Sequence, residues 1–242
     1  MPEVERALAA EAVGELALRT PEEILAWALQ RFGSRFAIVT AFQAEGIVII
    51  DMARRLDPQV RVATVDTGRL PEETYEVIEN VRAQLGVGVE VIAPVAEEVE
   101  AMVSAHGPNL FRRDQVLRQR CCQLRKVNPL NRFLRGLDAW ATGLRRDTGP
   151  SRANVAKVAV DLAHGGMVKI NPLAEWTKQQ VWEYVRANRL PEHPLYRHGH
   201  TSIGCAPCTR AVLPGEGERA GRWWWESDER RECGIHQLLP GD

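Results

Sequence analysis

Short apolar runs rich in β-branched residues alternate along the chain with longer segments whose apolar positions recur every three or four residues. The runs predict buried strands and the segments predict helices, because these two periods belong to strand and helix. Strands are predicted at residues 35–42, 60–65, 87–92 and 138–142, with candidate edge strands at 155–160 and 167–170. Strands alternating with helices of this length are typical of βαβ units, so we expect an α/β fold with a mostly parallel sheet.

Two predicted helices begin with capping signals. Thr20 precedes a proline and two glutamates and predicts a helix reaching about Phe32, and Thr177 with Gln180 forms a capping box for a helix reaching about Asn188. Further helices are predicted up to Leu56 and at residues 72–85, 96–105, 112–120 and 129–135. Because there is no internal repeat and no obvious linker, we expect one domain over residues 1–242, with a core at 1–200 and a functional tail at 201–242.

Composition excludes several classes of protein. The chain has 242 residues, with 45% hydrophobic and 26% charged residues, which is ordinary for a globular protein. Its 31 basic and 32 acidic residues give a net charge of −1, so we expect no nucleic-acid or membrane partner. No apolar run approaches the roughly 18 residues of a membrane span, and the acidic start is not a secretory signal. A cytoplasmic location is predicted.

Five cysteines supply the strongest chemical pattern: the adjacent pair Cys121 and Cys122, the C-x-x-C pair Cys205 and Cys208, and Cys233. An odd number with close pairs indicates a reducing compartment and metal or redox chemistry rather than a disulfide framework. Four thiolates suit either zinc or an iron–sulfur cluster. Adjacent cysteines reach one tetrahedral ion poorly but can bind different irons, so the residues favour a cluster and leave zinc open.

Weaker patterns follow the first two predicted strands. Thr40 opens the loop up to Gly46, where the first N–H groups of a helix could bind an anion, although the loop taken alone favours an ordinary turn between strand and helix. Thr67 lies in an Asp-Thr-Gly turn that either contacts a nucleoside or only ends a strand.

The last forty residues add a candidate nucleophile. Cys233 has arginines and His236 nearby in the sequence, and such neighbours lower the pKa of a thiol, yet a lone terminal cysteine is often incidental. The three consecutive tryptophans at residues 223–225 are interpreted as packing rather than as a base-stacking platform.

Guanidinium groups bind phosphate and sulfate, and candidate arginines for this role are Arg145, Arg146, Arg152, Arg219 and Arg222.

Taken together, the motifs resemble the assimilatory sulfonucleotide reductases over nearly the whole chain. The matching segments, in the family's order, are CCQLRK at 121–126, TGLRR at 142–146, KINPLAEWT at 169–177, SIGCAPCTR at 202–210, RAGRWWWE at 219–226 and ECGIH at 232–236. The resemblance implies a Rossmann-like, adenine nucleotide alpha hydrolase-like fold of the ATP pyrophosphatase type, with a mobile C-terminal tail. Because all four paired cysteines are present, it also implies one [4Fe–4S] cluster per chain, bound by Cys121, Cys122, Cys205 and Cys208.

The resemblance implies a thioredoxin-dependent reduction of adenosine 5′-phosphosulfate (APS). Cys233 would attack the sulfate sulfur to give S-sulfocysteine and AMP, and thioredoxin would then release sulfite. The substrate-binding residues implied by the family's motifs are Thr40, Thr67, Lys126, Gly143, Arg152, Arg219, Arg222 and His236. The cluster's nearness to Lys126 suggests an electrostatic and structural role rather than electron transfer.

The sequence differs from the family's pattern in two respects, and two alternative functions are considered. The loop at residues 42–46 reads FQAEG where many relatives have SGAED, which puts its phosphate contacts in question. The chain has nine residues after Cys233 and no fused thioredoxin-like domain, so a separate reductant is expected. Reduction of 3′-phosphoadenosine 5′-phosphosulfate (PAPS), alone or together with APS, is the first alternative, and a non-catalytic iron–sulfur nucleotide sensor is the second. Oligomeric state is left open.

Overall fold

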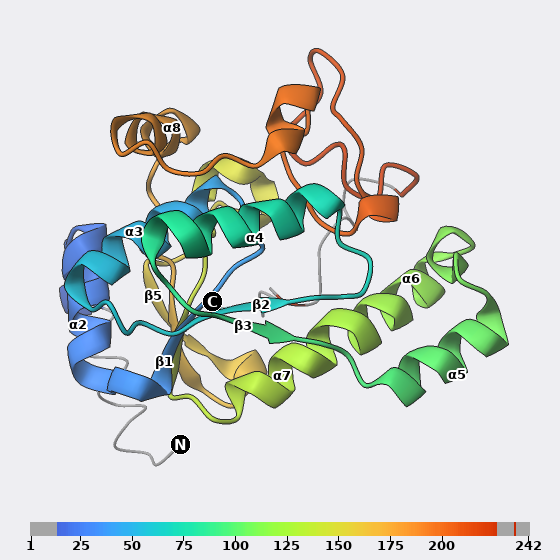
Figure 1. Cartoon of the computed structure of the whole chain (residues 1–242), viewed down its shortest axis with the longest axis horizontal. Coiled ribbons are helices and arrows are strands. Elements are labelled where there is room, and N and C mark those ends of the chain that lie inside the picture. Colours follow the sequence, from blue (N-terminus) through green and yellow to red (C-terminus); the bar gives the residue numbers. More distant parts are fainter. Residues whose placement is uncertain (1–13, 227–234, 236–242) are drawn as a thin grey trace.

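The computed structural model of the chain describes residues 14–226 and residue 235, and it is built around one six-stranded sheet (Figure 1). The strands lie side by side in the order β3-β2-β1-β4-β6-β5, and only β5 runs antiparallel to its neighbour. Their bounds are β1 Phe36–Val39, β2 Val62–Val65, β3 Val89–Ile92, β4 Ala139–Ala141, β5 Val158–Asp161 and β6 Met167–Ile170. The predicted mostly parallel α/β fold is confirmed.

Among the described residues, helix α2 precedes the first strand and six further α-helices connect or follow the strands. Both predicted capping boxes form, with Thr20 and Thr177 each accepting a hydrogen bond from the backbone N–H three residues later. The helices are α2 Pro21–Phe32, α3 Ala44–Leu56, α4 Glu72–Leu85, α5 Ala96–His106, α6 Gln115–Cys122, α7 Asn128–Leu134 and α8 Lys178–Ala187.

The hydrophobic core lies on both faces of the sheet because successive strand residues point to opposite faces. On β1, Phe36 and Ile38 belong to a large cluster with α2, α3, α4 and α8, whereas Ala37 packs with α7. Trp140 on β4 also packs with α7. Figure 1 shows β2 and β3 between α4 on one side and α7 on the other. This covering on both faces explains why the strands read as continuous apolar runs.

Two details of the predicted elements are wrong. Strand β6 is interior rather than an edge, because it pairs with β4 on one side and with β5 on the other. The helix predicted at residues 112–120 instead starts after Asp114, whose side chain accepts a hydrogen bond from the N–H of Leu117, and it continues through Cys121 and Cys122. Both cysteines therefore lie on the last turn of a helix.

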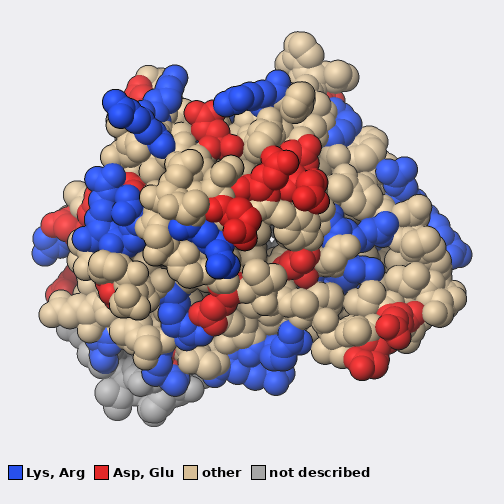
Figure 2. Space-filling model, in the orientation of Figure 1, with Lys and Arg blue, Asp and Glu red and all other residues tan. Residues whose placement is uncertain are grey.

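The surface mixes charges of both signs. Figure 2 shows basic and acidic side chains interspersed over the face in view, as the net charge of −1 suggests. Among the described residues, no helix is both long and apolar enough to cross a membrane. Of the predicted tail at residues 201–242, the structure describes residues 201–226 and 235; the rest, with Cys233 and His236, lies outside the described residues.

Candidate functional site

A cavity of about 170 Å³ lies at the carboxyl edge of the sheet, beyond the ends of β1, β2 and β4. Ligands of open parallel sheets bind at this edge, because the loops and helix N-termini there leave backbone N–H groups available. Seven of the eight predicted substrate residues line the cavity: Thr40, Thr67, Lys126, Gly143, Arg152, Arg219 and Arg222. The eighth, His236, lies outside the described residues. We call this cavity the nucleotide pocket.

The first turn of α3 forms the floor of the nucleotide pocket through unusually close backbone contacts. Thr40 accepts a hydrogen bond from the N–H of Phe42 at 2.9 Å, and its hydroxyl would lie 1.8 Å from a Cβ at Gly46. A Cβ at Gly143 would lie 2.8 Å from Cβ of Glu45. These two glycines allow the loop after β4 to contact the helix, which leaves the helix N-terminus facing the pocket.

The loop at residues 42–46 is bonded to segments far away in the chain. The side-chain oxygen of Gln43 accepts a hydrogen bond from the N–H of Ile203 at 2.7 Å. Gln43 thereby ties the start of α3 to the segment that carries Cys205. The N–H of Ala44 donates to the Tyr196 hydroxyl at 3.0 Å, so it is already satisfied within the chain.

Cationic side chains form the opposite wall of the nucleotide pocket. Arg152 and Arg222 are both almost completely buried, and Arg219 is half-buried beside them. Arg222 donates a hydrogen bond from Nη1 to the carbonyl of Ile203 at 3.2 Å, while its buried Nε has no partner within residues 14–226 and 235. A buried guanidinium with an unused N–H is costly unless a ligand accepts from it, so this wall suits an anion.

The four paired cysteines converge on a second, smaller cavity next to the nucleotide pocket. Cys121, Cys122, Cys205 and Cys208 all line it, and all four are free thiols. Around them lie aromatic and cationic residues: Arg69, Phe111, Arg118, Arg125, Lys126 and Trp223. We call this the cysteine cavity. The structure therefore brings together the two cysteine pairs, which are more than eighty residues apart in the sequence.

Lys126 lines both cavities and influences the thiols directly. Burial opposes ionisation of Cys205, but Lys126, a hydrogen bond with Thr67 at 3.2 Å and the charge of Arg222 together lower the pKa of Cys205. By contrast, burial and the neighbouring Cys205 raise the pKa of Cys208 to about 12. A cation is thus shared between the thiols and the nucleotide pocket.

A π-helical turn, Gln123–Val127, places Lys126 in this position. It joins α6 to α7 without a break, so the two cysteines and the lysine lie on one continuous helical segment. A π-turn is wider than an α-turn and is found mostly at functional sites. Arg125, on the same turn, donates to the carbonyl of Thr67 at 2.7 Å and so fastens the turn to the loop after β2.

Residues that the sequence did not single out complete the cysteine cavity. Arg118 on α6 is 2% exposed, donates to both carboxylate oxygens of Glu226 at 2.9 Å and hydrogen-bonds Cys122. Trp223 is fully buried against the cysteines, which confirms packing as the role of this tryptophan. In the sequence, Arg118 is one of several arginines on a basic helix, and nothing there distinguishes it from a solvated side chain.

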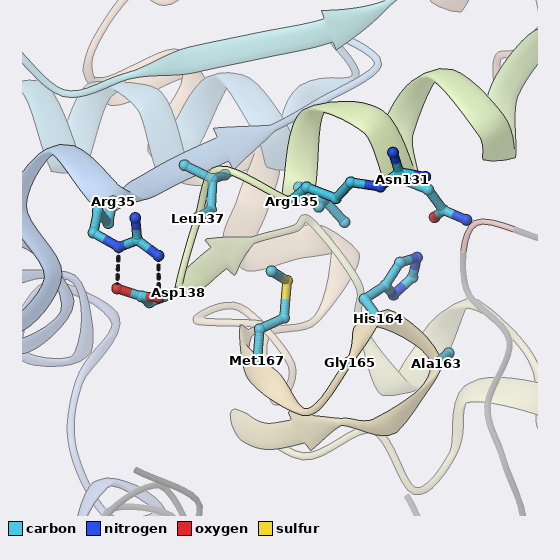
Figure 3. A pocket seen from close by; sticks show the side chains of 10 residues that line it. Arg35, Asn131, Arg135, Leu137, Asp138, Ala163, His164, Gly165 and Met167 are labelled. Carbon is cyan, nitrogen blue, oxygen red and sulfur yellow. Dashed lines mark hydrogen bonds and ion pairs between the residues drawn. The ribbon is translucent and has the colours of Figure 1, made fainter. Parts of the chain in front are cut away.

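A larger cavity, of about 760 Å³, lies at the opposite, amino edge of the sheet (Figure 3). Arg35 precedes β1 and Asp138 precedes β4, and Figure 3 shows the ion pair between them on the cavity wall. His164 also lines it and binds Asp161 at 2.7 Å. No residue predicted to carry chemistry lies there, and the ends of parallel strands that bind ligands are at the other edge, so we place the site at the nucleotide pocket despite its smaller volume.

The fold and site first define a class: an adenine nucleotide alpha hydrolase-like α/β protein with a cysteine cavity beside its ligand pocket. Within that class, the sequence profile of the phosphoadenosine phosphosulfate reductase domain matches residues 35–211. The chain therefore belongs to the phosphoadenosine phosphosulfate reductase family.

Individual relatives agree with this assignment. The chain is 46% identical to the adenosine 5′-phosphosulfate reductase of Allochromatium vinosum over 198 residues, which cover 82% of this chain and 77% of the relative. It is 43% identical to the enzyme of that name from Pseudomonas aeruginosa, over 91% of this chain and 84% of the relative. Among solved structures, the phosphoadenylyl-sulfate reductase of Candida auris, in a phosphate complex, matches with a TM-score of 0.71 and 28% identity, covering 84% of this chain and 96% of that one.

Proposed function

We propose that the chain is an adenosine 5′-phosphosulfate reductase that converts APS to AMP and sulfite with electrons from thioredoxin. One observation carries the proposal: the nucleotide pocket and the cysteine cavity adjoin, and Lys126 lines both. The names of relatives that are 43% and 46% identical over most of the chain support APS as the substrate.

The cysteine cavity fits a [4Fe–4S] cluster better than a zinc ion. Within residues 14–226 and 235, no group of three or more Cys, His, Asp or Glu side chains is arranged to hold a single metal ion. Yet four thiols line one cavity, and buried N–H groups of Arg125 and Trp223 on its wall have no partner in the described chain. Unpaired donors of this kind suit the sulfides and thiolates of a cluster.

The ligands of the cluster would be Cys121, Cys122, Cys205 and Cys208. A cluster held by these four thiolates would supply net negative charge. Arg69, Arg125 and Lys126 line the cavity and would offset that charge.

In the mechanism we propose, the chain's own residues first bind and orient the substrate. Thr40, Gly143 and the N-terminus of α3 hold the nucleotide, with Thr67 beside them. Arg152, Arg219, Arg222 and Lys126 surround the phosphosulfate and stabilise the charge that builds on the leaving phosphate oxygen. From the match to the family's motif we infer that His236 contacts the same anion.

Cys233 then provides the nucleophile. Its thiolate attacks the sulfate sulfur, the bond between that sulfur and the bridging phosphate oxygen breaks, and AMP leaves with the electron pair, which gives S-sulfocysteine. Cys233 lies outside the described residues, but Ile235, two residues later in the sequence, lines the nucleotide pocket, which supports this role.

Thioredoxin completes the cycle by thiol exchange. One of its thiolates attacks Sγ of the modified Cys233 and expels sulfite, and its second thiol resolves the mixed disulfide. The thioredoxin dithiol loses two electrons as it becomes a disulfide. The sulfur of the sulfate group gains these two electrons and leaves as sulfite.

PAPS is the competing substrate, and one observation favours it: the Candida auris structure that matches this fold is named a phosphoadenylyl-sulfate reductase. The test is sulfite release and AMP or 3′,5′-ADP formation by cluster-loaded protein given APS or PAPS with reduced thioredoxin. We expect kcat/KM to be higher for APS. Higher kcat/KM for PAPS would reassign the substrate, and no sulfite from either would contradict the proposed function. The cytoplasmic location and the division at residue 200 remain predictions.

A further inference from the structure

The ring of Trp223 is in contact with two buried arginines that line different cavities, Arg118 at the cysteine cavity and Arg222 at the nucleotide pocket. The guanidinium carbon of Arg118 is 4.9 Å from the centre of the Trp223 ring, and that of Arg222 is 4.6 Å from the same centre. All three side chains are at most 5% exposed. Cations within about 6 Å of an indole ring are attracted to it, most strongly where water is excluded. One ring therefore binds two cations at once.

The backbone of Trp223 is held in a conformation that L-residues rarely adopt. Its φ is 42°, in the left-handed region. Such a residue persists only when its surroundings hold it there, and this kind of strain gathers at functional sites. The N–H of Trp223 donates to the carbonyl of Cys208 at 3.2 Å, which links this conformation to a residue of the cysteine cavity.

Arg118 fastens the ring from the side of the cysteine cavity. Arg118 hydrogen-bonds Cys122 and forms a bidentate ion pair with Glu226. Because Glu226 lies three residues after Trp223 in the sequence, this ion pair also connects Arg118 to the segment that carries the ring. Planar guanidinium groups make such two-pronged, stacked contacts, which lysine cannot reproduce. The position of Arg118 thus depends on the cysteine cavity and in turn determines the position of Trp223.

The surroundings of Arg222 restrict the conformations that its side chain can adopt. A Cβ at Gly204 would lie 2.2 Å from its Nη2, so only glycine leaves room for this side chain. Arg222 lines the nucleotide pocket, and no carboxylate within the described residues is bonded to it. The Trp223 ring is therefore the support that keeps this guanidinium buried and aimed.

We propose that Arg118 and Trp223 are positioning residues that couple the cysteine cavity to substrate binding by holding Arg222 in the nucleotide pocket. This inference rests on the proposed function, because it takes Arg222 as a contact of the substrate phosphate. It differs from the role of Lys126, which lines both cavities itself; Arg118 acts only through the ring.

The test is a double-mutant cycle on AMP binding, measured by calorimetry on holoenzyme with matched iron content. Arg222→Ala should raise the Kd of AMP about tenfold or more, and Arg118→Gln should raise it about three- to tenfold although Arg118 does not line the pocket. The double variant should be no more than about twofold weaker than Arg222→Ala alone, since Arg118 then has nothing left to position.

Arg112→Gln is the matched control. The guanidinium of Arg112 lies over the neighbouring rings of Trp224, at 5.8 Å, and Trp225, at 5.7 Å, instead of Trp223, and Arg112 lines neither cavity. We expect its effect on the Kd of AMP to stay within about twofold and to add to that of Arg222→Ala. Trp223→Phe, which keeps a ring of smaller size, should fall between wild type and Arg118→Gln.

If Arg118→Gln fails to load iron or to fold, the same cycle is run with Glu226→Gln, which removes the partner of Arg118 without touching the cavity wall. Additive effects in the cycle, or an unchanged Kd in both Arg118→Gln and Glu226→Gln, would overturn the inference. Wild-type protein that neither binds AMP nor releases sulfite would instead contradict the proposed function.

Discussion

The two edges of the sheet each carry a cavity, and the substrate-binding residues predicted from the sequence line the smaller one. At the amino edge, about 760 Å³ of space is lined by Arg35, which pairs with Asp138, by His164, which pairs with Asp161, and by the exposed Arg135. At the carboxyl edge, a cavity of about 170 Å³ is lined by Arg222, whose buried Nε has no partner among the described residues.

Unmet hydrogen-bonding capacity, rather than volume, is the reason to place the site at the carboxyl edge. Among the described residues, the buried group without a partner that lines the amino-edge cavity is Oδ1 of Asn131, which is neutral. Those that line the nucleotide pocket or the cysteine cavity are the N–H donors of Arg125, Arg222 and Trp223, two of them cationic. Leaving a charged donor unpaired costs more than leaving an amide oxygen unpaired, so a ligand is more strongly implied there.

The largest expected effect distinguishes Cys233 from the paired cysteines. Cys233→Ser should keep its iron and its affinity for AMP yet release no sulfite, because a hydroxyl is scarcely ionised at neutral pH. Wild-type protein given APS without thioredoxin should form one AMP per site and gain one SO₃ group on the Cys233 peptide, seen by mass spectrometry.

The control for this variant is Cys205→Ser, which should lose iron and activity together. Normal turnover by Cys233→Ser, or an SO₃ group on another residue, would contradict the mechanism.

Lys126→Ala should come next in size. Loss of one charged contact to an oxyanion costs about 1.5–3 kcal/mol, so kcat/KM for APS should fall roughly ten- to a hundredfold while iron is retained. Lys178→Ala removes an exposed lysine and serves as the control. Equal kinetics for the two variants would show that Lys126 contacts no substrate.

Gly204→Ala should have a smaller effect, directed at Arg222. The added Cβ would lie 2.2 Å from the guanidinium, which is the movable end of a side chain, so we expect Arg222 to shift and the fold to persist. KM for APS should rise about three- to tenfold with little change in Tm. Gly88→Ala, where a Cβ meets nothing within 4 Å, is the control, and a matching KM for the two variants would contradict the prediction.

His193 lies on the carboxyl side of the sheet and makes stability depend on pH. Burial lowers the pKa of His193 to about 4, and its Nε2 lies 3.0 Å from the Thr74 hydroxyl. The unfolded chain takes up this proton at about pH 6.5. The contribution of neutral His193 to the free energy of unfolding is therefore fully present above pH 6.5 and is lost as the pH falls toward 4. At pH 5.5 the free energy of unfolding should be lower by about 1.4 kcal/mol.

The measurement is denaturant unfolding at pH 7.5 and 5.5. His193→Gln should flatten the difference in the free energy of unfolding between the two pH values, whereas substitution of the exposed His198 should leave it unchanged. The same pH dependence in wild type and His193→Gln would refute the assignment.

The smallest effect is expected at the amino edge. Arg135→Ala and His164→Gln alter residues that line the larger cavity, and we expect kcat/KM and the Kd of AMP to remain within about twofold of wild type. A tenfold loss in either value, with iron intact, would mean that the larger cavity takes part in the reaction and that the comparison of the two edges is wrong.

Much of the fold could be predicted from the sequence because period and capping are local properties. The helix at residues 72–85 and the strand at 167–170 have the predicted bounds, and Thr20 and Thr177 cap as expected. The interior place of β6 could not be predicted, because strand order depends on pairing between distant segments.

The candidate site divides in the same way. The motifs identified the four cysteines and the residues of the nucleotide pocket, because those side chains recur at fixed spacing within short segments. Arg118 and Gln43 were missed, since their contacts, to Glu226 and to Ile203, are 108 and 160 residues away in the chain. A side chain whose role depends on such a distant partner carries no local pattern.

Because of the π-helical turn at Gln123–Val127, the number of residues in the CCQLRK motif determines the direction in which each side chain leaves the helix axis. Each residue of an α-helix advances the side-chain direction by about 100°, and a π-turn inserts one residue without breaking the helix. Deleting one residue between Cys122 and Lys126 would restore a regular helix, but it would rotate either Lys126 or the buried Leu130 and Leu134 away from their present neighbours. We therefore expect the segment to tolerate conservative substitutions but no insertion or deletion.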